Sequence, residues 1–205
     1  MRILFFSVWV LYLVTPMSMV AQNKILDKVI KKELQTKIKE YNNENWKLLG
    51  DSLSLKVVLL NHYEKLLAEN VREIIGVASG FKSKDVGHQI ATNNVYNLYA
   101  LQAEYNLKGR IVSEYGSDIE TNQEFDHFYA AYGRLLEKEI KREIQESYSI
   151  IRDNGDGTFE IQTLFVADES TTQKTRIRAL ENAAKESAIA QKYVEKFADF
   201  IRLGD

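Results

Sequence analysis

The segment Ile144–Val166, IQESYSIIRDNGDGTFEIQTLFV, alternates apolar and polar residues on both sides of the sequence DNGDG. A period of two places successive side chains on opposite faces of a β-strand. Asn-Gly and Asp-Gly pairs tolerate the positive φ angles that tight hairpin turns require. We therefore predict a β-hairpin with Tyr148 and Ile150 on one face of its first strand. One face of the second strand carries Phe159, Ile161, Thr163 and Phe165.

Two more strands are expected before the hairpin in the chain. One is a short strand over Trp46–Leu49, and the other covers Val71–Phe81. In the second strand, glycine and serine residues lie among and after Ile74, Ile75 and Val77, and glycine in a strand permits another backbone to approach closely. Together with the hairpin, these segments predict a small antiparallel sheet of about four strands.

Five segments carry apolar residues at the three-to-four spacing of an amphipathic helix. They are residues 24–40, 53–70, 85–109, 122–140 and a final stretch of about eight turns ending near residue 201. Asp168, Ser170 or Thr171 would cap the final helix, and its small alanines are expected to pack closely on the sheet.

Two of these helices carry specific expectations about burial. The helix over 53–70 is apolar around much of its circumference, so we expect it to be the most buried one. The helix over 85–109 is followed by the polar stretch Ile111–Thr121, which contains Gly116 and predicts a loop or a frayed end. The inner side of this helix is assigned to Val86, Ile90, Ala91, Val95, Leu98, Leu101 and Tyr105.

The order of these elements predicts an α+β fold in which long amphipathic helices pack on the antiparallel sheet. Residues Tyr41–Asn45 are mostly of types that favour turns, so we place a boundary there. We expect an amphipathic N-terminal helix and linker over 22–45, followed by a single α+β domain over 46–205.

The first 21 residues are typical of a secretory signal peptide, because Arg2 precedes the apolar run Ile3–Val14 and short residues follow up to Ala21. The run is shorter than the roughly 20 apolar residues that cross a bilayer core. We expect cleavage before Gln22 and an exported protein with no transmembrane span. The expected location is the periplasm or the outer-membrane periphery of a Gram-negative bacterium.

Charge and cysteine content narrow the classes of partner. The formal net charge is −2, with both signs mixed along the chain, so we expect no nucleic-acid partner. The chain has no cysteine, so disulfides cannot stabilise it and no lipidated cysteine can follow the signal peptide. Its stability must come from buried apolar surface.

Several of these features together resemble the Lpp-twenty family of bacterial envelope lipoproteins. They are the strand ending in Gly76–Ser79, the strand Glu146–Arg152, the Asp156-Gly157 turn, the strand Phe159–Val166 and the alanine-bearing last helix. The chain is also similar to small exported proteins of unknown function in Bacteroidota. The resemblance implies an envelope location and a compact α+β domain. The chain departs from the family by lacking the lipidated cysteine and by inserting the aromatic helix Phe125–Ile140.

No motif of known catalytic or metal-binding chemistry is complete in the sequence. Asp153–Gly157 resembles a calcium loop in composition, but Gly155 stands where a ligand is needed and the closing glutamate is missing. His62, His88 and His127 do not have the four-residue spacing of helical metal ligands. A Gly-x-Ser-x-Gly elbow is also missing. We therefore expect no catalytic residue, no metal site and no cofactor.

Two consecutive helices carry many aromatic residues. They are Tyr96, Tyr99, Tyr105, Phe125, Phe128, Tyr129 and Tyr132. Such rings either pack together as core or line a cleft that receives a ligand. If a cleft exists, its ligand-binding residues would be Asp126, His127, Tyr99, Phe128 and Tyr132.

Two hypotheses of function follow. The first is an exported, non-catalytic cell-envelope protein that acts through association, with the helix Lys24–Glu40 docking onto a second copy or another envelope protein. The lysines of this helix also allow peripheral contact with anionic lipid. The alternative is a periplasmic small-molecule binder, or an unrecognised hydrolase, that uses the aromatic cleft.

Overall fold

The computed structural model describes residues 19–50, 53–116 and 123–203, and it has the expected α+β fold. The hairpin is present as β3 (Gln145–Asp153) and β4 (Phe159–Asp168), which pair antiparallel. Its turn is closed by the Asn154 N–H, which donates to the Thr158 carbonyl at 3.0 Å, and Gly155 and Gly157 both have a φ of +82°. The turn chemistry of DNGDG therefore sets the hairpin as predicted.

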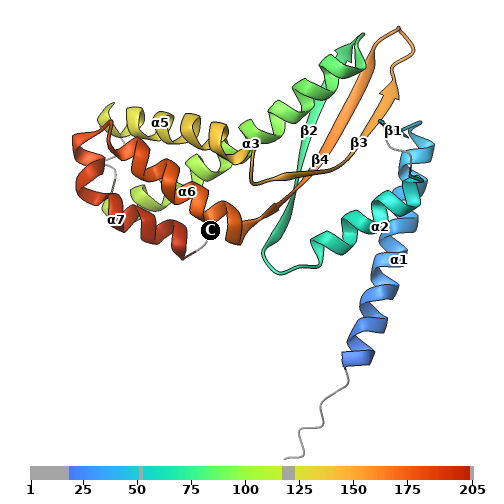
Figure 1. Cartoon of the computed structure of the whole chain (residues 1–205), viewed down its shortest axis with the longest axis horizontal. Helices are drawn as coiled ribbons and strands as arrows, with labels where there is room; N and C mark the ends of the chain where they lie inside the picture. The colour runs from blue at the N-terminus through green and yellow to red at the C-terminus, as the bar shows by residue number, and fades with distance from the viewer. Residues whose placement is uncertain (1–18, 51–52, 117–122, 204–205) are drawn as a thin grey trace, which may run out of the picture.

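Within the described residues the sheet has four strands in the order β1-β3-β4-β2 (Figure 1). The short strand β1 (Lys47–Leu48) forms one edge, and β2 (Val71–Phe81) forms the other. All neighbouring strands run antiparallel. The hairpin thus occupies the centre, and β2, the longest described strand, is left at an edge.

Six helices lie within the described residues, where the sequence pattern indicated five. They are α1 (Met19–Asn43), α2 (Leu55–Leu66), α3 (Lys84–Tyr115), α5 (Gln123–Ile140), α6 (Glu169–Ala184) and α7 (Ala188–Arg202). The prediction of a loop from Ile111 is wrong, because α3 continues to Tyr115 and buries Ile111 in the core. Residues 117–121 of that predicted loop lie outside the described residues, as does the apolar run of the predicted signal peptide.

The final helix, expected as one piece of eight turns, is two helices. The Ser187 side chain accepts a hydrogen bond from the Ala190 N–H at 3.1 Å and so caps the start of α7. Asp168 caps α6 in the same way, accepting from Ser170. The break lets α7 fold back on α6, which one continuous helix could not do.

Helices α5, α6 and α7 form a helical lobe with the C-terminal half of α3, at one end of the sheet (Figure 1). The lobe has its own apolar core, in which Leu136, Ile140, Leu180 and Phe197 are fully buried. The alanines of α6 face α5 and α7 more than the sheet, which corrects the expectation that they pack on strands. Small side chains serve helix–helix packing here.

The N-terminal half of α3 covers one face of the sheet, over β2 and β4. A side chain at Gly76 would collide with the Ala91 carbonyl oxygen of α3, so only glycine allows this approach. The close backbone contact expected at the glycines of this strand is therefore confirmed at Gly76.

Helices α1 and α2 cover the opposite face over β3 and part of β4. The core there consists of Leu34, Tyr41, Trp46, Val58, Leu59, Tyr148, Ile150 and Leu164. The second half of α1 thus belongs to the body, and the expected linker over Tyr41–Asn45 is the end of α1, where the Trp46 N–H donates to the Tyr41 carbonyl at 2.8 Å. Among the described residues, no helix combines the length and apolarity that crossing a bilayer requires.

Candidate functional site

The five residues proposed to line an aromatic cleft do not converge. Tyr99, Phe128 and Tyr132 are almost completely buried and belong to the core of the helical lobe. Asp126 and His127 lie on the exposed side of α5, where the Asp126 carboxylate is 3.5 Å from the Lys108 ammonium. These three rings are therefore core, as the alternative interpretation of the same pattern predicts, whereas Tyr105 is exposed.

The acidic turn of the hairpin uses its oxygens internally. Asp153 accepts a hydrogen bond from the Gly155 N–H, and Asp156 accepts from both the backbone N–H and the hydroxyl of Thr158. These Thr158 hydrogen bonds hold the pKa of the Asp156 carboxyl below its usual value. In the described part of the chain, no group of three or more acidic or histidine side chains is placed to hold a metal ion.

The edge strand β2 carries the first feature that points to binding. Asn94 of α3 donates its side-chain N–H to the Val77 carbonyl at 2.8 Å, so the backbone of Val77 faces away from β4. In an antiparallel strand every second residue faces the same way, so the backbones of Glu73 and Ile75 also face outward. No charged residue or proline follows Glu73 in this strand. Natural edges are usually protected by such residues.

An apolar stripe of α3 runs beside this edge. Leu98, Leu101 and Tyr105 are 47%, 53% and 77% exposed, and Ile75 and Val77 of β2 are 40% and 44% exposed. A groove of about 670 Å³ lies between strand and helix. We call it the edge groove; its lining includes Ile74, Ile75, Leu98, Leu101, Gln102 and Tyr105.

The exposure of this stripe corrects the inner side assigned to α3. The helix faces the sheet and the lobe core with Gly87, Ala91, Val95, Tyr99, Ala103 and Leu107. Small residues at 87 and 91 bring the helix axis close to β2, and this turns Leu98, Leu101 and Tyr105 outward. The sequence carries two apolar stripes on this helix, and the predicted inner side combines residues of both.

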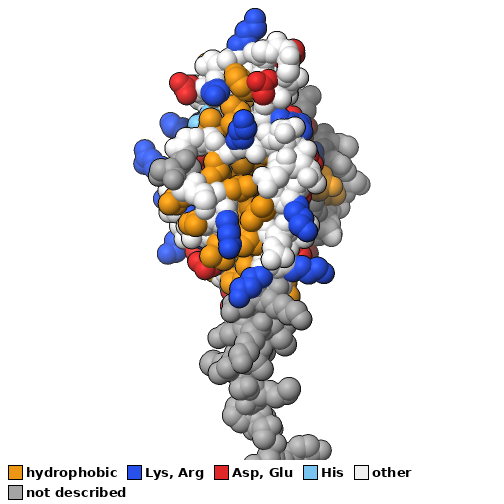
Figure 2. Space-filling model, turned by 90° about the vertical axis from the view of Figure 1, so that its right-hand side faces the viewer, with side chains coloured by type: hydrophobic (Ala, Val, Ile, Leu, Met, Phe, Trp, Pro, Cys, Tyr) orange, Lys and Arg blue, Asp and Glu red, His pale blue; other side chains and the backbone are white. Residues whose placement is uncertain are grey.

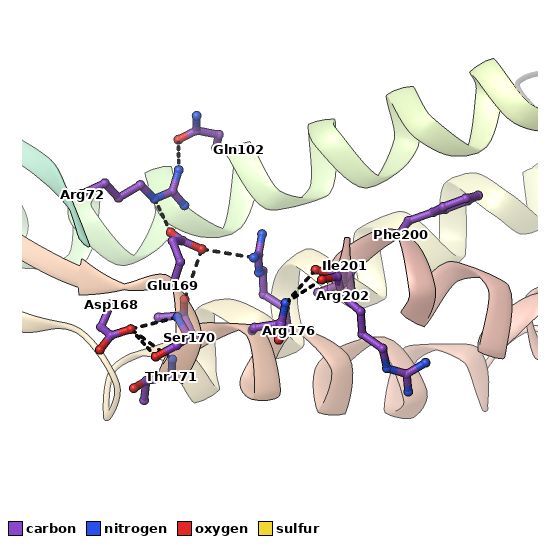
Figure 3. Close-up of polar contacts among 12 residues, drawn as sticks. Arg72, Gln102, Asp168, Glu169, Ser170, Thr171, Arg176, Phe200, Ile201 and Arg202 are labelled. Atoms are coloured by element: carbon purple, nitrogen blue, oxygen red, sulfur yellow. Dashed lines mark hydrogen bonds and ion pairs between the residues drawn. The ribbon is translucent and has the colours of Figure 1, made fainter. Parts of the chain in front are cut away.

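A polar cluster adjoins the edge groove at Gln102, and Figure 3 shows its contacts. Arg72 of β2 donates to Gln102 of α3 at 3.1 Å, and its Nε atom lies 2.5 Å from the Glu169 carboxylate. The second oxygen of that carboxylate is 3.1 Å from Arg176, whose side chain is 4% exposed. The Arg72 guanidinium also lies over the Tyr99 ring. The cluster joins β2, α3 and α6, so it fixes the position of the edge strand relative to the helix.

A second apolar surface lies on α2. This helix buries Val58, Leu59 and His62, whereas Leu53, just before it, and Val57 and Leu60 are at least 36% exposed. The expectation that this helix is the most buried is therefore wrong, because the sheet covers only one of its two apolar sides. We call residues Leu53, Val57, Leu60 and Leu67 the outer α2 stripe. Figure 2 shows the side of the molecule that carries α1 and α2, with apolar side chains down its middle and Lys or Arg on both sides.

Comparisons with family models, with curated proteins and with solved structures found no match to this chain. The candidate site therefore depends on the geometry alone. The sequence predicted the strand Val71–Phe81 and the apolar residues of α2 and α3. It did not predict the edge groove, because the order of the strands in a sheet depends on contacts between distant segments. The uncharged run from Ile74 to Phe81 was the one available signal.

Proposed function

We propose that this chain is an exported, non-catalytic cell-envelope protein that acts through protein association, with an extended segment of a partner adding to the sheet at β2. The observation that carries the proposal is the outward-facing backbone of β2 beside the exposed apolar stripe of α3. The envelope location is supported by the N-terminal sequence and by the resemblance to the Lpp-twenty family.

An added strand would contact both sides of the edge groove, the backbone of β2 and the apolar stripe of α3. The outward N–H and C=O groups of Glu73, Ile75 and Val77 would gain backbone partners, as in other complexes formed by β-augmentation. One face of the added strand would cover Leu98 and Leu101. Burying the exposed half of each leucine contributes roughly 1 kcal/mol. Backbone pairing would give affinity, and the apolar platform would select apolar side chains.

Site-specific photo-crosslinking in cells tests this proposal. A photoreactive phenylalanine analogue is placed at Val77 in the full-length chain, and a matched control carries it at Lys185, which is exposed in the turn between α6 and α7. We expect covalent protein adducts in the envelope fraction from position 77 and their loss when Leu101→Glu is added. Adducts that are equal at both positions, or absent from both, would contradict the proposal.

A second candidate function is contact with anionic lipid through the outer α2 stripe. Residues 29–67 contain Lys31, Lys32, Lys37, Lys39, Lys47, Lys56 and Lys65, against Glu33, Glu40, Glu44, Asp51 and Glu64. An apolar stripe within a basic region favours an anionic membrane surface. Vesicle flotation tests it: the protein should float with anionic vesicles at low salt, less at high salt, and not with neutral vesicles. Val57→Glu combined with Leu60→Glu should abolish flotation, whereas Leu98→Glu should not.

A further inference from the structure

We infer that the segment received by the edge groove is β2 of a second copy of this chain, paired antiparallel about a two-fold axis at Ile75. This inference rests on the function proposed for the edge groove and narrows it to one occupant. Three independent properties of the groove support a second copy: the position of α3, the distribution of charge along β2 and the place where the strand becomes irregular.

The position of α3 makes the surface self-complementary. Adjacent strands lie about 4.8 Å apart, and α3 packs on both β2 and β4, so pairing β2 with its copy places the two α3 helices roughly 5–10 Å apart. Helices pack at 8–10 Å. Leu98 and Leu101 of one copy would then meet the same residues of the other. A bare peptide strand would pair with the edge but would leave part of this stripe exposed.

The charge of Glu73 distinguishes among the registers in which β2 could pair with its copy. With the axis at Ile75, the two Ile75 residues oppose each other and Glu73 opposes Val77, so no like charges meet. An axis at Glu73 would place two carboxylates opposite each other, which is unfavourable. The Val77 carbonyl keeps its bond from Asn94 in the favoured register, because a carbonyl oxygen can accept a second hydrogen bond.

Among the axes centred on an outward-facing residue, the irregular end of β2 disfavours the third, at Val77. The pairing of β2 with β4 shifts between Ser79 and Phe81, where Gly80 has a φ of +81°. A bulge of this kind bends an edge away from a regular partner. An axis at Val77 would bring this bulge into the ladder, whereas an axis at Ile75 keeps the new pairs within residues 71–79. The regular part of the β2 edge is therefore centred at Ile75, which is also the axis that the charge of Glu73 favours.

The absence of cysteine from the chain permits a direct test of this register. Directly opposed residues of a hydrogen-bonded antiparallel pair have Cα atoms about 5.5 Å apart, within the range of a disulfide. Ile75→Cys should therefore give a covalent dimer on mild oxidation. Val77→Cys is the matched control, because its Cα lies on the same face and edge but roughly 13 Å from its counterpart in the second copy. We expect at least tenfold more disulfide-linked dimer from the first variant on a non-reducing gel.

Sedimentation of the protein purified after export gives an independent readout. The unmodified chain should sediment as a dimer, Leu101→Glu as a folded monomer and Lys185→Glu, in the exposed turn between α6 and α7, as a dimer. Disulfide formation by Val77→Cys that equals or exceeds that of Ile75→Cys overturns the register. A monomeric unmodified chain overturns the self-pairing; if position 77 still gives photo-adducts with another protein, the association through β2 stands without it. If the unmodified chain is a monomer and position 77 gives no photo-adducts, both proposals are overturned.

Discussion

The Nε2 atom of His62 on α2 lies 2.6 Å from a carboxylate oxygen of Glu73 on β2, and its Nδ1 atom lies 2.9 Å from the Ser147 hydroxyl on β3. The ring is only 1% exposed. Both of its nitrogens are thus satisfied inside the core, as a buried polar side chain requires. The contact between His62 and Glu73 therefore connects α2, on one face of the sheet, to the edge strand β2.

Replacing His62 should detach this end of α2. We expect His62→Ala to lower the free energy of unfolding by about 2–3 kcal/mol, because it leaves a cavity and removes two hydrogen bonds. Urea unfolding followed through the fluorescence of the buried Trp46 measures the change. His88→Ala is the control: its contact with Glu146 is half exposed, so the cost should stay below about 1 kcal/mol. Equal costs would contradict a structural role specific to His62.

High pH should loosen α1 from the sheet. The hydroxyls of Tyr41 and Tyr148 lie 2.9 Å apart, and burial raises the pKa of Tyr41 to about 12 and that of Tyr148 further. Because the folded-state pKa of Tyr41 lies above the unfolded value of 10, the stability that the neutral hydroxyl contributes is complete below pH 10. It is lost as the pH rises towards 12. The loss attributable to Tyr41 should be on the order of 3 kcal/mol.

The matched variants separate this effect from general alkaline unfolding. Tyr41→Phe combined with Tyr148→Phe keeps both rings and removes both ionising groups, so its stability should change less between pH 10 and 12. Tyr105→Phe removes an exposed hydroxyl and should behave as the unmodified chain. Urea unfolding at a series of pH values measures all three, and identical alkaline losses in all of them would refute the assignment.

Two glycine substitutions should have opposite signs. Gly76→Ala forces a methyl group against the backbone of Ala91, so we expect a loss of several kcal/mol or failure to fold. Gly109→Ala meets nothing within contact distance in the middle of α3, and alanine should stabilise the helix there by about 0.5–1 kcal/mol. Thermal unfolding of the two variants checks both signs. A tolerated Gly76→Ala would mean that α3 lies further from β2 than described.

The Glu169 carboxylate, which two arginines share, should contribute far more to the free energy of unfolding than the exposed ion pair of Glu139. Glu169→Gln removes the negative charge between Arg72 and Arg176, and Arg176 is buried, so we expect a loss of about 3 kcal/mol. Glu139→Gln breaks the pair with the exposed Arg178 and should cost less than about 1 kcal/mol. Chemical denaturation at low and high salt distinguishes them, because only the surface pair should weaken with salt.

The two apolar stripes of α3 show where prediction from sequence stops. Periodicity correctly placed Leu98 and Leu101 on a helix, but it assigned them to the inner side together with Ala91 and Val95. A period of 3.6 reports that residues share a face and does not report which neighbour covers it. The same limit applies to α2, whose outer stripe has the composition of a core and lies exposed.

Local chemistry was sufficient for the hairpin turn at Asp153–Gly157 and the extent of the strand Val71–Phe81, and it narrowed the cap of α6 to Asp168, Ser170 or Thr171, because each depends on contacts between residues close in the chain. The order of the strands, the edge position of β2 and the side of α3 that meets the sheet depend on contacts between distant segments. These arise from competition among several apolar surfaces for a limited core, so they emerge only when the whole chain has folded.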